Sequence, residues 1–391
     1  MKNNNINEKI HINKTAAIII LITFVLFITA LAGMFTCIVI DIVNNDGGYV
    51  SLDNGGGGSK KPVGTTAQDA PAAVVSKAGN KTGILLPCVT KSGTYLAPST
   101  ASTSEITNIS SAAGALINVT SGNAVAMKNA DVKIFPASMT KVMTLLVACE
   151  NAKDPNALVT VTEEMVKKYQ GSYKPSEEGP SIAFTWKQGY QVTVEDLLYL
   201  VIYESDTYAC WLLSEYVAGS EAAFVDMMNK RAGELGLTST QFKNSTGLFD
   251  DGHYTTCREM AAIMAAAINN ETAKTVLGSK ALYRVDIYVG GEKVNTVGMY
   301  SNWYTGRLEK YQYENTNPKY AGNGSDIEII GGKTGYETVP MNCYVTAGIN
   351  DVTGTMYVCV QVGRISDDQP EINAKTSTDD NRLIYQKYAK D

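Results

Sequence analysis

The chain has 391 residues, of which 45% are hydrophobic, so it has room for one large domain or two ordinary ones with a sizeable core. Charged residues make up 18% and the net charge is -6, with no long basic run, which argues against nucleic acid as a partner. His11 and His253 are the only histidines, and this scarcity disfavours Ser-His-Asp catalysis and histidine-rich metal sites.

An uncharged apolar segment follows a short N-terminal tail of residues 1–14. Residues 15–40 are rich in Ile, Leu, Val and Phe, and about 20 such residues span a bilayer as a helix. Lysines precede the segment and aspartates follow it, so the positive-inside rule places the tail in the cytoplasm and the rest of the chain outside the cell. A cleaved signal peptide is the alternative, because Ala30-Leu31-Ala32 resembles a cleavage site. Both interpretations export the rest of the chain.

Residues 41–104 predict a flexible linker. Their first part is poor in large apolar side chains and contains four consecutive glycines from Gly55 to Gly58, a composition that cannot bury enough surface to fold. Residues 81–104 fit either more linker or an added strand around Ile84. The remaining residues, 105–391, are expected to form one domain.

Turn signals and apolar periodicity predict the elements of this domain. Two short apolar runs around Ser121-Gly122-Asn123 predict a hairpin. Helical periodicity predicts helices over residues 139–149, 197–203, 208–217, 222–235 and 259–268. Apolar runs near the end predict strands over 327–330, 343–349 and 356–362, with a closing helix over 383–388. Strands at both ends with helices between them predict an α/β fold, with one mixed sheet and a helical lobe.

The seven cysteines contain no Cys-x-x-Cys pair, so zinc and thioredoxin-like functions are disfavoured. Cys343 and Cys359 lie on two predicted strands joined by a turn. A cross-strand disulfide is one interpretation of this pair, and two buried thiols are the favoured one.

Ser138 and Lys141 form the first chemical motif, because residues three apart at a helix start share one face. A serine hydroxyl becomes a good nucleophile when a neighbouring base takes its proton. A lysine can be that base if burial lowers its pKa. The alternative is a serine that caps the helix, beside a lysine whose ammonium reaches solvent.

Two further motifs follow along the chain. Ser205-Asp206-Thr207 lies in the break between two apolar helices, where Ser205 could relay a proton or the segment could simply cap the next helix. Residues 331–335, Gly-Gly-Lys-Thr-Gly, close a predicted strand. There Lys333 and Thr334 suit a carboxylate, and an ordinary strand-end turn is the alternative. The three motifs in this order match the set found in penicillin-binding proteins and class A β-lactamases.

The sequence resembles the D-alanyl-D-alanine carboxypeptidase family of serine peptidases over roughly residues 110–390. The residues that carry the resemblance are Ser121-Gly122, Lys128-Asn129-Ala130, residues 136–144, Leu197-Leu198, Phe224-Val225, Met228-Asn229, Gly236-Leu237, residues 242–248, Tyr254-Thr255-Thr256, Asn315-Thr316-Asn317 and residues 331–336. The resemblance implies the penicillin-binding, β-lactamase-like transpeptidase fold, with helices on both faces of an antiparallel sheet.

The resemblance also implies the roles of the site residues. Ser138 is the nucleophile, Lys141 the general base and Ser205 the proton relay. Lys333, Thr334 and Gly335 bind substrate, and the backbone N–H groups of Ser138 and Tyr336 form the oxyanion hole. The implied substrate is the peptidoglycan stem pentapeptide, β-lactams are the implied inhibitors, and no metal or organic cofactor is expected. Together with the apolar segment, this predicts a single-pass protein of the bacterial cell membrane with an extracellular catalytic domain.

The three motifs leave the roles of Thr207, Arg364 and His253 open. Thr207 stands where the family usually has asparagine, so we expect reduced turnover or altered preference at this substrate-binding position. Arg364 is either a second carboxylate contact or a solvent-exposed side chain. His253 is favoured as a residue that structures its loop, with a site role as the alternative.

Two competing functions remain open. One is a β-lactamase, although no Glu-x-x-Leu-Asn pattern follows Ser205, and the other is a catalytically weakened penicillin-binding sensor.

Overall fold

The computed structural model describes residues 103–169, 185–279, 281–301, 327–337, 342–366 and 368–390, and all of them belong to one unit, Pro71–Asp391. The predicted tail, the predicted membrane segment and nearly all of the predicted linker lie outside these residues. Within the described ranges, no helix has both the length and the apolar character needed to cross a membrane.

A six-stranded sheet forms one half of this unit. Its strands are β1 Ser104–Glu105, β2 Ala113–Asn118, β3 Asn123–Lys128, β8 Ile327–Gly335, β9 Cys343–Asn350 and β10 Met356–Val362, in the order β1-β3-β2-β10-β9-β8. The predicted hairpin is confirmed, since β2 and β3 pair antiparallel. The central strands β2, β9 and β10 are buried along nearly their whole length. Continuous burial is expected when helices cover both faces of a sheet.

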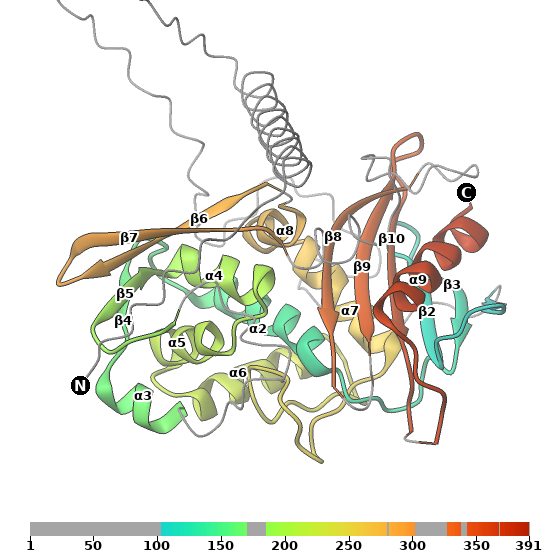
Figure 1. Cartoon of the computed structure of the whole chain (residues 1–391). Helices are drawn as coiled ribbons and strands as arrows, with labels where there is room; N and C mark the ends of the chain where they lie inside the picture. Colours follow the sequence, from blue (N-terminus) through green and yellow to red (C-terminus); the bar gives the residue numbers. More distant parts are fainter. Residues whose placement is uncertain are drawn as a thin grey trace, which may run out of the picture. The chain divides into compact units, whose positions relative to one another are not determined.

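Figure 1 shows the sheet between α9 Ala374–Tyr388 on one side and α7 Cys257–Ile268 on the other. Both helices begin at a side-chain cap: Asn373 accepts from the N–H of Thr376, and Thr256 accepts from the N–H of Glu259. Ten of the twelve α7 residues are buried, so α7 is the central helix of the core. The predicted arrangement of helices on both faces is therefore confirmed.

The helical lobe packs beside α7. It contains α2 Lys141–Asn151, α3 Glu163–Tyr169, α4 Val194–Tyr203, α5 Thr207–Ala218, α6 Glu221–Glu234 and α8 Glu271–Gly278, and the short 3-10 helix η1 Ala137–Thr140 precedes α2. Thr193, Asp206 and Ser220 cap α4, α5 and α6 through side-chain oxygens. Such caps satisfy backbone N–H groups that a helix start leaves without partners.

A second sheet covers the outer side of this lobe (Figure 1). It has four strands, β4 Leu158–Thr160, β5 Tyr190–Thr193, β6 Tyr283–Val289 and β7 Glu292–Met299, in chain order. It is joined to α4 by Asp196, whose carboxylate accepts a hydrogen bond of 3.0 Å from the Tyr283 hydroxyl. Burial raises the pKa of this carboxyl to about 6.

Several expectations need correction. The prediction of one sheet was wrong because the second sheet exists, and the main sheet is not wholly antiparallel because β1 pairs parallel with β3. The strand predicted over 327–330 continues to Gly335, so residues 331–335 belong to the strand and are no turn. The disulfide interpretation was also wrong, because Cys343 and Cys359 are separate buried thiols.

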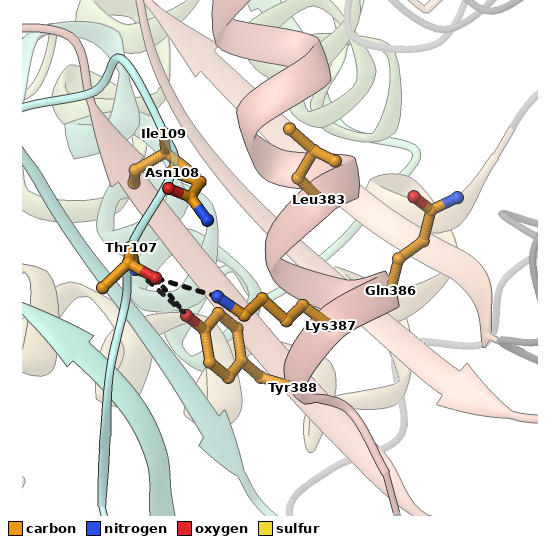
Figure 2. Close-up of a pocket in the computed structure, with 7 residues that line it drawn as sticks. All are labelled: Thr107, Asn108, Ile109, Leu383, Gln386, Lys387 and Tyr388. Atoms are coloured by element: carbon orange, nitrogen blue, oxygen red, sulfur yellow. Dashed lines mark hydrogen bonds between the residues drawn. The ribbon is translucent and has the colours of Figure 1, made fainter.

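A small surface pocket lies where the N-terminal end of the described unit meets α9. Its volume is about 310 Å³, and it is lined by residues 107–109, Leu383 and residues 386–388 (Figure 2). Lys387 donates to the Thr107 hydroxyl at 2.8 Å, and the Thr107 N–H donates to the Tyr388 hydroxyl at 3.0 Å. These bonds fix the chain where it enters the domain, at a place distant in sequence from the motifs.

Candidate active site

The nucleophile turn brings Ser138 and Lys141 together. Ser138 lies in η1, and Lys141 is the first residue of α2. The Nζ of Lys141 is 3.0 Å from the Oγ of Ser138, and Lys141 is only 2% exposed. The interpretation of Ser138 as a helix cap and of Lys141 as a solvent-reaching lysine is therefore wrong. Lys141 is buried, and Thr140 rather than Ser138 occupies the cap position of α2.

A second hydrogen bond fixes the lysine, and the sequence did not reveal it. The Nζ of Lys141 donates to the backbone carbonyl of Thr246 at 2.5 Å. The Asn244 side chain shapes the turn that carries this carbonyl, because its Oδ1 accepts from the N–H groups of Thr246 and Gly247. Thr144 on α2 donates to the Ser245 carbonyl at 2.6 Å. The turn is thus bonded to the same helix face that carries the lysine.

Gly247 allows the turn to approach the nucleophile. Its φ is +80°, and a Cβ added there would lie 2.0 Å from the carbonyl oxygen of Ala137. Ala137 itself has a positive φ of 46°, a strained value for a residue with a side chain. The backbone before Ser138 and the turn at Gly247 therefore determine each other's conformation.

Burial changes the protonation equilibrium of Lys141. Desolvation holds the pKa of Lys141 below its usual 10.5, and nearby Cys210, Asp206 and Glu337 oppose that shift. A lowered pKa increases the fraction of neutral amine, which is the form that accepts a proton from a serine hydroxyl. The site therefore has the geometry and the electrostatics of a serine activated by a lysine base.

Ser205 and Lys333 form a second pair. Ser205 lies between α4 and α5 with a φ of 55°, and its Oγ accepts a hydrogen bond of 3.0 Å from the Nζ of Lys333. Lys333 is 1% exposed and also donates to the Thr334 carbonyl at 2.8 Å. The capping interpretation of this segment holds for Asp206, but Ser205 has a separate contact with the strand.

The end of β8 lies against the nucleophile. A Cβ added to Gly335 would be 3.2 Å from the backbone nitrogen of Ser138 and 2.5 Å from the Sγ of Cys343. A side chain at this position would force Cys343 and the backbone before Ser138 to shift, so glycine allows the close approach of β8 to Ser138. The Tyr336 side chain is 61% exposed at the edge of the site.

Strand β8 connects the two pairs. Gly335 lies against the backbone nitrogen of Ser138, and Lys333, two residues earlier on the same strand, contacts Ser205. Three segments far apart in the sequence, the η1–α2 turn, the α4–α5 break and the end of β8, thus converge on one site. Among the residues that the structure describes, no cluster of His, Cys, Asp or Glu could hold a metal ion.

Thr207 and Arg364, the other predicted substrate-binding residues, are both at least partly buried. Thr207 is the first residue of α5 and is half-buried, and its hydroxyl makes no hydrogen bond to any residue within the described ranges. Arg364 follows β10 and is only 6% exposed, so the expectation of a solvent-exposed arginine was wrong.

His253 organises the loop beside the nucleophile turn. Its Nδ1 accepts from the Lys243 N–H at 3.3 Å, which leaves Nε2 to donate to the Thr140 hydroxyl at 2.9 Å. Burial lowers the pKa of His253 to about 4, so the ring is neutral at physiological pH. The favoured interpretation, a residue that structures its loop, agrees with these contacts, and the loop reaches η1 through them.

The fold and the site define a serine enzyme of the type that pairs its nucleophile with a lysine three residues later. Residues 99–361 match the family model Peptidase_S11, described as D-alanyl-D-alanine carboxypeptidase. Because the match covers more than half of the chain, the protein belongs to this family.

Curated relatives agree with this assignment. The D-alanyl-D-alanine carboxypeptidase DacC of Escherichia coli strain K12 is 38% identical over 168 residues, which are 43% of this chain and 42% of that protein. DacF of Bacillus subtilis strain 168 is 35% identical over 164 residues, 42% of this chain and 40% of that protein. The chain thus spans about two fifths of the length of these relatives. The D-alanyl-D-alanine carboxypeptidase of Streptomyces sp. strain K15 is 29% identical over 289 residues, covering 70% of this chain and 94% of that protein.

Solved structures share the fold. The Streptomyces K15 DD-transpeptidase matches with a TM-score of 0.55 at 22% identity, covering 72% of this chain and 98% of that one. Penicillin binding protein 5 from Haemophilus influenzae matches with a TM-score of 0.54 at 22% identity, covering 72% and 71% of the two chains.

Proposed function

We propose that this protein is a serine-type D-Ala-D-Ala carboxypeptidase, which removes the terminal D-alanine from peptidoglycan stem pentapeptides through an acyl-enzyme. The observation that carries the proposal is the 3.0 Å contact between Ser138 Oγ and the buried Nζ of Lys141. Membership in the carboxypeptidase family supports the choice of substrate.

Acylation begins with proton transfer. Neutral Lys141 accepts the Ser138 proton while Oγ forms a bond to the carbonyl carbon between the two D-alanines. The oxyanion that develops accepts from the backbone N–H groups of Ser138 and Tyr336. When the tetrahedral intermediate collapses, the C–N bond breaks. The leaving amine takes, through the Ser205 hydroxyl, the proton that Lys141 received from Ser138, and Lys141 is neutral again. Water then hydrolyses the ester and restores Ser138.

We expect the substrate carboxylate to bind beside Lys333 and Thr334. Lys333 supplies a buried charge and Thr334 a hydroxyl, both on the last residues of β8. Buried Arg364 is the second cation proposed for the carboxylate, and Gly335 leaves space for the peptide backbone. A β-lactam places its own carboxylate and carbonyl in the same positions and acylates Ser138, so penicillin is expected to bind covalently.

Thr207 supports one second candidate, a catalytically weakened penicillin-binding sensor. An asparagine at this position offers both a donor and an acceptor to a substrate amide, whereas threonine offers a single hydroxyl. We rank the carboxypeptidase first because Lys141 contacts Ser138 and Lys333 contacts Ser205, which supports an intact site. No observation favours a β-lactamase.

The proposed domain arrangement follows the sequence. Residues 15–40 anchor the protein as a single membrane-spanning helix, residues 41–104 are a flexible tether, and residues 105–391 act outside the cell on the wall. The lipid bilayer and the stem peptide are the proposed partners, and the proposed location is the bacterial cell membrane. A protease-protection experiment on intact cells tests this topology, since an extracellular domain is degraded by added protease.

The activity is tested by incubating the full-length protein with a peptide ending in D-Ala-D-Ala and measuring the release of D-alanine. We expect release by the wild type and none by Ser138→Ala. Penicillin that attaches to Ser138 without any D-alanine release would favour the sensor, and rapid release of hydrolysed penicillin would favour a β-lactamase. Equal D-alanine release by wild type and Ser138→Ala would refute the proposal.

A further inference from the structure

We propose that Asp206 is a positioning residue of this site, which holds Ser205 in place and supplies a buried negative charge that keeps Lys141 a strong base. The inference rests on the proposed function, because it assigns Asp206 a part in the acylation of Ser138. Asp206 is the middle residue of the second motif, Ser205-Asp206-Thr207.

Asp206 is fully enclosed and its carboxylate has partners on both oxygens. It is 1% exposed; Oδ1 accepts from the Ala209 N–H at 3.0 Å and Oδ2 from the indole N–H of Trp186 at 2.9 Å. Donors on both oxygens match an ionised carboxylate, which only accepts. The start of α5, a helix of 12 residues, adds a favourable dipole for negative charge.

The backbone and the side chain of Asp206 together restrain Ser205. The Asp206 N–H donates to the Leu200 carbonyl at 3.2 Å, so the backbone after Ser205 is tied to the last turn of α4. On its other side, the Asp206 carboxylate is tied to α5 and to Trp186. Ser205 has a φ of 55°, an unfavourable conformation that persists only where neighbouring contacts enforce it. The result is the 3.0 Å contact between Ser205 and Lys333.

Trp186 connects this turn to the rest of the lobe. It lies in the segment before β5, is 8% exposed, and stacks on Tyr208 with ring centroids 6.2 Å apart and an interplanar angle of 21°. An indole that is buried needs a partner for its N–H, and Asp206 is that partner. The tryptophan therefore holds the carboxylate in one orientation.

The charge of Asp206 acts on Lys141. Burial raises the pKa of Asp206 and lowers that of Lys141. The charge of each residue opposes the effect of burial on the other, and the hydrogen bonds that Asp206 accepts also lower its pKa. Cys210 on α5 and Glu337 after β8 also act on Lys141, and its charge in turn lowers the pKa of His253.

Groups around Asp206 itself complete the electrostatic environment. Glu204 ends α4, and burial, reinforced by the Asp206 charge, raises the pKa of this glutamate to about 7. Tyr208 and Cys210 face Asp206 from α5, and its charge raises the pKa of each, after the larger effect of burial. Unlike Glu204, Asp206 is fully buried, and its carboxylate accepts hydrogen bonds from the Ala209 N–H at the start of α5 and from the Trp186 indole.

The test compares the pH dependence of acylation in full-length wild type, Asp206→Asn and Trp186→Phe. Asparagine keeps a capping oxygen but removes the charge, so the pKa of Lys141 falls and neutral amine persists to lower pH. We expect the acid limb of the labelled-penicillin acylation profile to move down by roughly one pH unit. Trp186→Phe keeps the ring stack but loses the indole donor, and we expect a smaller shift in the same direction.

Ser220→Ala is the matched control, because it removes the cap of the neighbouring helix α6 without touching the site. It is expected to leave the acid limb where it is. A lysine labelled with carbon-13 at Cε reports the pKa of Lys141 directly by NMR, and does so without any catalysis. An unchanged Lys141 titration in both Asp206→Asn and Trp186→Phe would overturn the inference, even if the wild type acylates normally. A wild type that is never acylated would instead overturn the proposed function, with the lysine titration still deciding the inference.

Discussion

Gly247→Ala is expected to disable the turn that carries Ser138, although residue 247 lies outside the three motifs. A Cβ at residue 247 would lie 2.0 Å from the Ala137 carbonyl oxygen, 2.5 Å from its carbon and 3.0 Å from the Thr140 hydroxyl. All three atoms belong to the backbone or side chains of the turn that carries Ser138. Either this turn or the 244–247 loop must move, and the loop carries the Thr246 carbonyl that holds Lys141.

The magnitude follows from two contributions. Holding a residue with a Cβ in the left-handed region costs about 1–2 kcal/mol. Displacing a packed neighbour typically costs about 1–3 kcal/mol more. We therefore expect the free energy of unfolding to fall by about 2–5 kcal/mol, and acylation to fall at least tenfold because Ser138 and Lys141 separate.

Gly219→Ala separates these two contributions. Gly219 ends α5 with a φ of +77°, but a Cβ added there meets nothing within 4 Å. Urea unfolding and the rate of labelling by fluorescent penicillin are measured for both variants. Gly219→Ala should lose only the conformational part of the stability and acylate normally. If Gly247→Ala lost no more stability than Gly219→Ala and acylated as fast as the wild type, the described coupling between the loop and the nucleophile would be wrong.

Three further predictions address single residues. Because burial holds the pKa of Lys141 below 10.5, acylation measured against pH should stay fast below that value and decline only where Lys141 becomes protonated. Thr207→Asn should raise the acylation rate by roughly tenfold, the worth of about one hydrogen bond, and an unchanged rate in stopped-flow labelling would contradict the role given to this position. The pKa of His253 is about 4 in the folded protein against 6.5 unfolded, so its contribution to stability is present above pH 6.5 and is lost as pH falls toward 4. Urea titrations should show that His253→Gln weakens this pH dependence.

The parts of the fold that the sequence predicted are those with local signals. The helices of the lobe are long and apolar, and the Ser138–Lys141 pair depends on a spacing of three residues within one turn. The contact between Lys333 and Ser205 joins positions 128 residues apart, so the motifs indicated it only through the resemblance to a known family.

The second sheet was missed for a physical reason. Most β7 residues are exposed, so the strand lacks the alternation of apolar and polar residues that reveals a half-buried strand. One signal was present: Gly290-Gly291, both at positive φ, form the two-residue turn between Val289 and Glu292. A glycine pair between two runs of this kind is a hairpin signal.

The sequence did not indicate Thr246, which contributes a backbone carbonyl, or the buried pair of Asp206 and Trp186. Thr246 contributes a carbonyl, which any residue possesses, so only the turn chemistry of Asn244 and Gly247 could have pointed to it. The pairing of Asp206 with Trp186 depends on packing between α5 and the segment before β5, and no spacing in the sequence encodes that contact.

The most direct test of the central claim is to identify the residue that penicillin acylates. The full-length protein is incubated with penicillin and digested, and the modified peptide is sequenced by mass spectrometry. We predict a single adduct on Ser138, absent from Ser138→Ala and formed far more slowly by Lys141→Ala. An adduct on another residue, or undiminished labelling of Ser138→Ala, would contradict the account.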